Sequence, residues 1–326
     1  MTSVKLIYRK KKAGFNSIEN VFDALLPYFG KHIEKIELPF ESTGLINRIK
    51  NIWYVRKIAK NTVIHITGHD HYLALGLKKE NTILTIHDIE FIKRNKGFKK
   101  FLLKKLWMDY PIKRVKMVTT ISKFSQQEIL HLNNYKTPIC VINDPLTLTI
   151  EKKDKSFNTT CPNILHIGTK PNKNLPNLIK ALKEINCRLT IIGKLNQILE
   201  DQLIANNINY TSKSNLSNTE IVEEYEHCDL LAFVSTYEGF GLPIIEAQAM
   251  GRVVITSNIA AMPEVANGSA LLVNPFNVDE IREGILNLIE NNELRNRLIT
   301  LGFENLKRFQ PELIAKQYLD LYQANK

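Results

Sequence analysis

Residues 229–257 read DLLAFVSTYEGFGLPIIEAQAMGRVVITS and contain the clearest structural pattern in the chain. The stretch opens with an apolar run that predicts a buried strand, and a loop with two glycines follows. Pro243 then opens a run of helix formers, because a proline at the start of a helix gives up no hydrogen bond. Gly251 stands where a glycine ends a helix, and residues 252–257 predict the next buried strand. Strand, glycine loop, helix and strand is the repeating unit of a parallel α/β sheet.

The glycine loop before the predicted helix suits an anion. A helix N-terminus presents unpaired N–H groups and the positive end of the helix dipole. Gly239 and Gly241 can adopt positive φ and let a ligand approach the backbone closely. Two carboxylates frame the loop, Glu238 on the loop itself and Glu246 in the first predicted helical turn, and carboxylates suit hydroxyl groups. Phosphate plus several hydroxyls describes a nucleotide sugar; the alternative is an ordinary α/β turn with a glutamate that complements the dipole.

Residues 238–247 resemble the E-x7-E signature of family-4 retaining glycosyltransferases with the GT-B fold. Residues 263–265, Pro-Glu-Val, also fit that family's pattern. The resemblance is close over most of the C-terminal half and loose over the N-terminal half. It implies that Glu238 contacts the donor sugar and Glu246 the ribose hydroxyls. It also implies that sugar and phosphate are cradled by the backbone amides of Gly239, Phe240, Gly241 and Leu242.

Both halves of the chain alternate short apolar segments with longer amphipathic ones, which indicates parallel sheets covered by helices on both faces. A chain of 326 residues is long enough for two domains with separate cores. Together with the resemblance, this predicts an α/β GT-B fold of two Rossmann-like domains that face a cleft. We expect an N-terminal acceptor-side domain at 1–150, a nucleotide-sugar-binding domain at 151–310, and a last helix at 311–326 that packs back on the N-terminal domain. The charged segment 151–160 is the predicted linker.

The individual elements follow from the same alternation of segments. The predicted strands are residues 4–8, 33–38, 62–66, 82–86, 117–121 and 139–142 in the N-terminal half, and 164–167, 188–192, 229–235, 252–257 and 270–273 in the C-terminal half. The predicted helices include residues 18–28, 175–184, 278–290, 293–308 and 312–323, and another helix that begins at 220.

The composition excludes several classes of protein. No apolar run approaches the roughly 20 residues needed to cross a bilayer, and the N-terminus lacks the apolar core of a signal peptide. The four cysteines are scattered without C-x-x-C spacing, which indicates a reducing compartment, so we expect a cytoplasmic protein. The net charge of +11 predicts an anionic partner. Because zinc-finger spacing, an RNA-binding aromatic motif and a recognition helix are all missing, we expect no nucleic-acid partner.

A second glycine loop follows the first predicted strand. Gly14 precedes the helix predicted at 18–28, with Asn16 and Glu19 as a capping pair. In the resembled fold a glycine loop at this place faces the ligand, so Gly14 is a predicted donor-binding residue. The alternative is a plain strand-to-helix turn beside solvated lysines.

Four histidines lie at or after two predicted strands of the N-terminal half: His65, His69, His71 and His87. The carboxyl edge of a parallel sheet is where α/β proteins place ligands. The resemblance implies that this region lies near the acceptor and the reacting centre, and we expect Asp70 and His71 to act there as hydrogen-bonding or proton-relay groups. Each histidine could instead be a core or capping residue. A metal site that also uses Asp88 is a further alternative, although no known ligand spacing is present.

Residues 93–116 contain ten lysines or arginines and one acid, Asp109, interleaved with aromatic and aliphatic residues. A basic amphipathic helix with an aromatic face is typical of a segment that docks on an anionic membrane surface. The alternative is a surface helix whose lysines are solvated and whose aromatics pack on the sheet.

The loop at 168–174, Gly-Thr-Lys-Pro-Asn-Lys-Asn, follows a predicted strand and precedes a predicted helix. It resembles the family loop in which an arginine and a lysine hold the donor diphosphate. Lys173 matches the lysine, whereas Asn172 occupies the arginine position, so that Lys170 would have to supply the second charge. A lysine tolerates such a shift better than a bidentate arginine would. Thr169, on the same loop, is a further predicted donor-binding residue.

The predicted activity is retaining transfer of a sugar from a nucleotide-sugar donor to a glycan or lipid-linked acceptor in cell-surface polysaccharide synthesis. No D-x-D motif is present, so we expect no metal and no cofactor beyond the donor itself. The missing G-x-G-x-x-G fingerprint argues against a dinucleotide. One alternative is a nucleotide-sugar epimerase on the same fold. Others are a catalytically silent nucleotide-binding subunit, and a protein whose charge alone binds lipid or nucleic acid.

Overall fold

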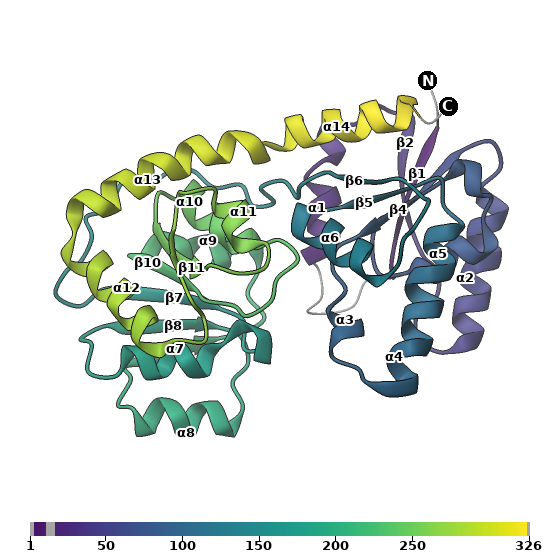
Figure 1. Ribbon diagram of the computed structural model, residues 1–326. Helices are drawn as coiled ribbons and strands as arrows, with labels where there is room; N and C mark the ends of the chain where they lie inside the picture. Colours follow the sequence, from purple (N-terminus) through teal and green to yellow (C-terminus); the bar gives the residue numbers. More distant parts are fainter. Residues whose placement is uncertain (1–2, 11–16, 325–326) are drawn as a thin grey trace. The chain divides into compact units, whose positions relative to one another are not determined.

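A computed structural model describes residues 3–10 and 17–324 of the chain. The chain forms two compact units. The N-terminal unit comprises Met1–Thr147 together with Gln310–Lys326, and the C-terminal unit comprises Leu148–Phe309. Each unit is built around a six-stranded sheet flanked by helices, as Figure 1 shows. The predicted α/β fold with two parallel-sheet units is therefore confirmed.

The sheet of the N-terminal unit has the order β2-β1-β3-β4-β5-β6, and every pair in it is parallel. Its six strands were all predicted, with ends that agree within one residue. Their bounds are β1 (Val4–Tyr8), β2 (Ile33–Glu37), β3 (Val63–Ile66), β4 (Thr82–Ile86), β5 (Met117–Thr120) and β6 (Ile139–Val141).

The sheet of the C-terminal unit has the order β12-β11-β10-β7-β8-β9, again with parallel pairs throughout. Five of its strands were predicted, whereas the edge strand β9 was missed because its sequence, Tyr-Thr-Ser-Lys, is polar and mostly exposed. Their bounds are β7 (Asn163–Ile167), β8 (Arg188–Ile192), β9 (Tyr210–Lys213), β10 (Leu230–Phe233), β11 (Val253–Ser257) and β12 (Leu271–Val273).

The strand order reverses once in each sheet, between β1 and β3 in the N-terminal unit and between β7 and β10 in the C-terminal unit. At such a switch point the following connections leave toward opposite faces, which opens a crevice at the carboxyl ends of the strands. The two switch points therefore mark the places where each unit can hold a ligand.

The helices of the N-terminal unit are α1 (Ser17–Asp23), α2 (Leu45–Ile58), α3 (Glu90–Lys93), α4 (Gly97–Lys104), α5 (Tyr110–Lys113), α6 (Lys123–Leu132) and α14 (Pro311–Ala324). The prediction of one helix over 18–28 was wrong at its end. Helix α1 stops at Asp23, and a 3₁₀ turn at Leu26–Tyr28 follows. Pro27 explains the break, because it has no N–H to donate to the carbonyl of Asp23 four residues earlier.

The helices of the C-terminal unit are α7 (Leu175–Leu182), α8 (Gln197–Ala205), α9 (Asn218–His227), α10 (Leu242–Ala249), α11 (Met262–Ala266), α12 (Val278–Glu290) and α13 (Asn292–Leu306). Helix α10 begins at Leu242, with Gly241 as its N-cap and Pro243 in its first turn. Glu246 consequently lies in the second turn, and its placement in the first turn was wrong. The predicted glycine stop is present, since Gly251 has φ +74° just beyond the helix.

The last helix, α14, belongs to the N-terminal unit, as the resemblance implied. Its Tyr322 hydroxyl lies 2.7 Å from Nδ1 of His65 on β3, and its Tyr318 ring packs against the rings of Phe22 and His65. The other ring nitrogen of His65 lies 2.7 Å from the Thr85 hydroxyl. Burial lowers the pKa of His65 to about 3, so the imidazole is neutral and donates to one of these hydroxyls while it accepts from the other.

Candidate functional site

The switch point of the C-terminal unit lies where β7 and β10 separate. Their ladder ends at the pair Leu231 and Leu165, and beyond it His166 donates from Nδ1 to the carbonyl of Ala232 at 3.0 Å. His166 is fully buried, and this burial lowers its pKa to about 4. A neutral histidine is therefore buried beneath the switch point, and its Nε2 has no hydrogen-bond partner. Sequence reasoning missed this role, because His166 occurs inside an ordinary apolar strand.

Lys173 and Glu238 meet at this crevice. Lys173 lies in the short 3₁₀ turn after β7, and its Nζ donates to Glu238 Oε1 at 2.7 Å. The ammonium also lies 4.9 Å from the ring centre of Phe233 on β10. The lysine stem passes over Gly168, where a Cβ would lie 2.7 Å from Lys173 Cγ. The two residues that were predicted to bind the donor from separate loops are thus adjacent.

Asn172, which occupies the predicted arginine position, joins the two loops of the crevice. Its side-chain amide donates to the carbonyl of Tyr237 at 3.0 Å and to Glu238 Oε1 at 3.3 Å. Its own carbonyl accepts from the amide of Thr236 at 2.8 Å. Asn172 therefore orients Glu238 and carries no charge toward a diphosphate, and Lys170 on the same loop is exposed.

The start of α10 forms the other wall of the crevice. Gly241 has φ +122°, the conformation for which the sequence pattern required a glycine, whereas Gly239 does not have positive φ. The Phe240 side chain is buried against Phe309 with ring centres 5.5 Å apart, so its backbone is the part that can face a ligand. The first N–H groups of a helix have no acceptor within the helix. The loop into α10, including Leu242, thus offers amides beside the carboxylate of Glu238.

Glu246 and Thr169 complete the predicted donor residues of this unit. Glu246 Oε2 accepts from the hydroxyl of Tyr225 at 2.7 Å, and the residue is 8% exposed. The Thr169 hydroxyl donates to the carbonyl of Lys194 at 2.8 Å, so its side chain joins the loops after β7 and β8. The Tyr225 contact was not foreseen, since that residue precedes Glu246 by 21 positions on another helix.

In the N-terminal unit, Asp70 and His71 follow β3 at the switch-point edge of the sheet. Asp70 is 7% exposed, and burial raises its pKa against the opposing effects of a hydrogen bond from Ser42 and the charge of Arg9. Arg9 is itself paired with Glu19, through contacts of 2.5 and 2.9 Å. Asp70 therefore binds its proton more firmly than an exposed aspartate does. Gly14 and Asn16 lie outside the residues that the structure describes.

His71 is fully buried and donates from Nδ1 to the carbonyl of Trp107 at 2.7 Å. The Trp107 carbonyl can accept this hydrogen bond because Pro111, four residues later, has no N–H to donate to it. Burial lowers the pKa of His71 to about 3, and its Nε2 has no hydrogen-bond partner. This ring is consequently a neutral acceptor. The rings of His69 and His71, and of His69 and His87, lie 6.3 Å apart, so the histidines form a loose cluster.

Asp144 is a further acid at the carboxyl edge of this sheet. It follows β6, is 5% exposed, and burial raises its pKa to about 6 although the charge of His87 opposes the rise. His87 donates from Nε2 to the carbonyl of Thr67 at 2.8 Å. Aspartate before proline is also a common turn sequence, so no feature of the sequence distinguished this residue.

The described residues contain no group of three or more His, Cys, Asp or Glu side chains that could hold a metal ion. The metal alternative for the histidine cluster therefore has no site in residues 3–10 and 17–324. A search of the same residues found no helix long and apolar enough to cross a membrane.

The sequence of the chain is similar to those of known glycosyltransferases. The family model for glycosyl transferases group 1 matches residues 149–304. O-antigen chain mannosyltransferase B of Escherichia coli is 25% identical over 94% of this chain and 86% of its own length. O-antigen chain mannosyltransferase RfbU of Salmonella typhimurium is 28% identical over 72% of this chain and 70% of its own length.

Solved structures share the fold. The Anabaena protein HepE in complex with UDP-glucose has a TM-score of 0.79 at 15% identity, covering 98% of this chain and 99% of its own. WaaG, a glycosyltransferase involved in lipopolysaccharide biosynthesis, has a TM-score of 0.72 at 13% identity, covering 98% and 99%. Given the two parallel sheets, the family match and these relatives, the protein is a glycosyltransferase with the GT-B fold whose residues 149–304 belong to the glycosyl transferases group 1 family.

Proposed function

We propose that the protein transfers mannose from a nucleotide-sugar donor to a glycan or lipid-linked acceptor, with retention of anomeric configuration. The relatives named above support mannose, since both are mannosyltransferases of O-antigen chains. The donor side of the proposal depends on one observation, the 2.7 Å pair of Lys173 and Glu238 on the loops at the switch point.

Each polar group at the crevice then has a role. Lys173 and the amides of the loop into α10 bind the diphosphate, because both present positive charge to it. Glu238 accepts hydrogen bonds from the sugar hydroxyls, and Glu246 accepts them from the ribose. The backbone at Thr169 lies at the carboxyl edge of the same sheet. The Thr169 side chain is held there by its hydrogen bond to the carbonyl of Lys194.

Donor binding exchanges one partner of Lys173 for another. In the free protein the lysine neutralises Glu238, and in the complex it turns to the diphosphate and leaves the carboxylate for the sugar. During transfer the bond from the anomeric carbon to the diphosphate oxygen breaks while the acceptor oxygen attacks from the same face. The acceptor proton passes to the departing diphosphate. Charge that develops on this group is stabilised by donors that are already in place, which is usually the largest catalytic contribution.

Asp70 and His71 are the proposed groups on the acceptor side, and Gly14 is a proposed donor contact. The raised pKa of Asp70 suits a group that shares a proton with a hydroxyl. His71 is suited to accept a hydrogen bond at Nε2, because its Nδ1 proton is engaged by Trp107. We propose that no metal or other cofactor takes part, since Lys173 and the helix amides supply the positive charge.

The experiment is a screen of purified protein against GDP-mannose, GDP-glucose, UDP-glucose and UDP-N-acetylglucosamine, with thermal stabilisation as the first readout. The stabilising donor is then incubated with lipid-linked and oligosaccharide acceptors in the presence of EDTA, and the anomeric configuration of the product is measured by NMR. An inverted product or an EDTA-sensitive reaction would contradict the mechanism. An epimer formed from the donor alone would favour the epimerase alternative, which none of the relatives named above supports.

We further propose that the N-terminal unit docks on an anionic membrane surface. Helix α4 is followed by a π-helical turn at Lys105–Asp109 and by α5, so part of the basic segment is π-helical instead of the regular helix predicted. Two of its aromatics are exposed, Phe98 at 78% and Phe101 at 55%, whereas Trp107 packs against the core of the unit. Lys99 and Lys100 are exposed beside them. A cytoplasmic leaflet with its anionic lipids fits this combination of lysines and exposed rings.

Helix α2, in the same unit, has a second group of exposed apolar residues. Its Leu45, Ile46 and Trp53 are each at least 70% exposed. The Arg48 guanidinium lies 4.6 Å from the ring centre of Trp107, which links α2 to the turn after α4, and Figure 1 shows the two helices side by side. Exposed apolar residues gathered on neighbouring helices commonly mark an interaction surface. An acceptor with a lipid anchor would be presented at such a surface.

A further inference from the structure

Tyr225 is a fully buried residue on α9, and its hydroxyl donates to Glu246 Oε2 at 2.7 Å. We infer that Tyr225 is a positioning residue for donor binding, which fixes the Glu246 carboxylate where it accepts from the ribose. The inference depends on the proposed function, because it assumes that Glu246 contacts the donor nucleotide. Tyr225 itself would touch no part of the donor.

The direction of the hydrogen bond is set by the surroundings of the phenol. Burial and the nearby charge of Glu246 both raise the pKa of Tyr225 well above its usual value of 10. The hydroxyl is therefore always protonated and always a donor, so the carboxylate oxygen that faces it is held as an acceptor. A hydrogen bond to a charged group is among the stronger ones in proteins. Glu246, in the second turn of α10, thus has a fixed neighbour on a different helix.

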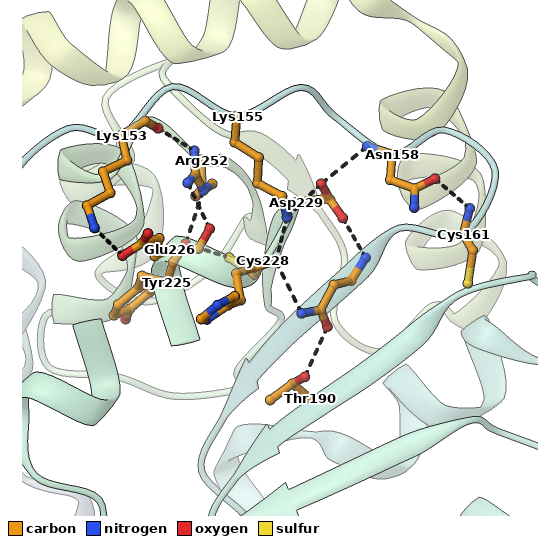
Figure 2. A network of polar contacts seen from close by, with 12 residues as sticks. Lys153, Lys155, Asn158, Cys161, Thr190, Tyr225, Glu226, Cys228, Asp229 and Arg252 are labelled. Carbon is orange, nitrogen blue, oxygen red and sulfur yellow. Dashed lines mark hydrogen bonds and ion pairs between the residues drawn. The ribbon is translucent and has the colours of Figure 1, made fainter. Parts of the chain in front are cut away.

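The backbone of Tyr225 is fixed as well, as Figure 2 shows. Arg252 donates from Nε to the carbonyl of Tyr225 at 3.0 Å and from Nη2 to the carbonyl of Glu226 at 2.9 Å. These are carbonyls of the last turn of α9, which have no donor within the helix. The third contact of Arg252, from Nη1 to the carbonyl of Lys153 at 3.1 Å, fastens the segment before β7.

Arg252 also lies three residues after the end of α10, and its amide donates to the carbonyl of Ala247 at 2.8 Å. The end of α9 and the segment after α10 are consequently joined through one arginine, and the last turn of α9 is joined to the second turn of α10 through Tyr225 and Glu246. This double connection leaves the Glu246 side chain little freedom to turn away. It gives Tyr225 a role that a phenylalanine of the same shape could not fill.

The test is the variant Y225F, which keeps the ring and removes the hydroxyl. We expect the donor KM and the Kd for UDP or GDP to rise about tenfold, the change expected for one lost charge-assisted hydrogen bond, while kcat changes less than about twofold. The 2′-deoxy and 3′-deoxy forms of the same nucleotides supply the second arm. If Tyr225 acts through the ribose contact, wild type and Y225F bind at least one deoxy form with equal affinity.

Y135F is a matched control, because the Tyr135 hydroxyl also donates to a carboxylate at 2.7 Å, that of Asp109 in the N-terminal unit. It should leave the Kd for UDP and GDP unchanged. A tenfold loss that persists with both deoxy forms would show that Y225F acts through packing and would overturn the inference, as would unchanged nucleotide affinity in Y225F. A wild-type protein that binds neither nucleotide would instead refute the proposed function.

Discussion

Lys173 Nζ and Glu238 Oε1 lie 2.7 Å apart, although the two residues are 65 positions apart in the chain. Their side chains are 19% and 16% exposed, so the pair is shielded from water but open to a ligand. A donor diphosphate must displace the carboxylate from the lysine, and the displaced carboxylate then needs a new donor of hydrogen bonds. In the proposed mechanism a nucleotide sugar supplies both replacements at once, the diphosphate for Lys173 and the sugar hydroxyls for Glu238.

The variant E238Q tests the carboxylate of this pair. We expect kcat to fall by at least about 100-fold, because a neutral amide accepts sugar hydroxyls weakly and cannot stabilise positive charge at the anomeric carbon. The Kd for the nucleoside diphosphate should stay the same or improve, since Lys173 no longer has a competing anion. Steady-state kinetics and calorimetry measure the two effects. The control E223Q changes an exposed glutamate on α9 and should behave as wild type. If E238Q is as active as wild type, the Glu238 carboxylate does not have the proposed role.

Lys170 tests how the chain compensates for the asparagine in the arginine position. Lys170 is exposed in the donor-free protein and lies three residues before Lys173 on one short turn. If it supplies the second charge, K170M should weaken binding of UDP or GDP about five- to tenfold, the usual effect of one charged hydrogen bond. The control K180M removes an exposed lysine from α7. Equal losses in both variants would show a general charge effect, and no loss in K170M would leave Lys173 as the diphosphate lysine.

The membrane surface is tested by reversing Lys96, Lys99 and Lys100 to glutamate. Each basic group near an anionic leaflet contributes about 1 kcal/mol, so the triple change should lower the affinity for vesicles of phosphatidylglycerol and phosphatidylcholine by at least about 100-fold. Lys105 is left intact, because it pairs with the buried Asp109 at 2.9 Å and its reversal would disturb the fold. The control reverses Lys180, Lys183 and Lys316, which are equally exposed.

Co-sedimentation that is equally weak in both triple variants would mean that net charge alone drives binding. A second variant, F98S/F101S, separates rings from charges. We expect it to bind at low salt but to detach at lower ionic strength than wild type, because the insertion of the two rings is lost. Unchanged salt dependence would show that these exposed phenylalanines do not enter the bilayer.

The strands could be predicted from the sequence because a parallel sheet buries both faces and leaves continuous apolar runs. The central run at Leu230–Phe233 and its neighbours are such cases. Elements without this signal were missed, including the polar β9 and the five-residue α11, whose N-cap Ala261 supplies no side-chain cap. Glu246 was placed in the first turn and lies in the second, because the helix begins one residue earlier, at Leu242 instead of Pro243.

The candidate site was predictable where its residues belong to loops with a recognisable local sequence. Glu238, Gly241 and Lys173 could be named from local patterns, and the structure shows Lys173 and Glu238 in contact. The residues that orient them could not be named, since Tyr225 and His166 act across elements that are distant in sequence. A buried polar contact depends on which helices meet, and apolar periodicity does not specify the partner of a particular hydroxyl.

The raised pKa of Asp144 predicts that the stability of the N-terminal unit depends on pH. Its pKa is raised from 3.8 to about 6, so the folded state binds this proton more tightly than the unfolded state. The stability from the neutral acid is complete below pH 4 and is lost as the pH rises to 6, by about 3 kcal/mol in all.

D144N keeps the group neutral and should raise the unfolding temperature above that of wild type at pH 8 but not at pH 4. Thermal unfolding at both pH values measures this, with the exposed Asp320→Asn as the control. A D144N protein that is less stable than wild type at pH 8 would show that the ionised carboxylate has a favourable partner in the fold.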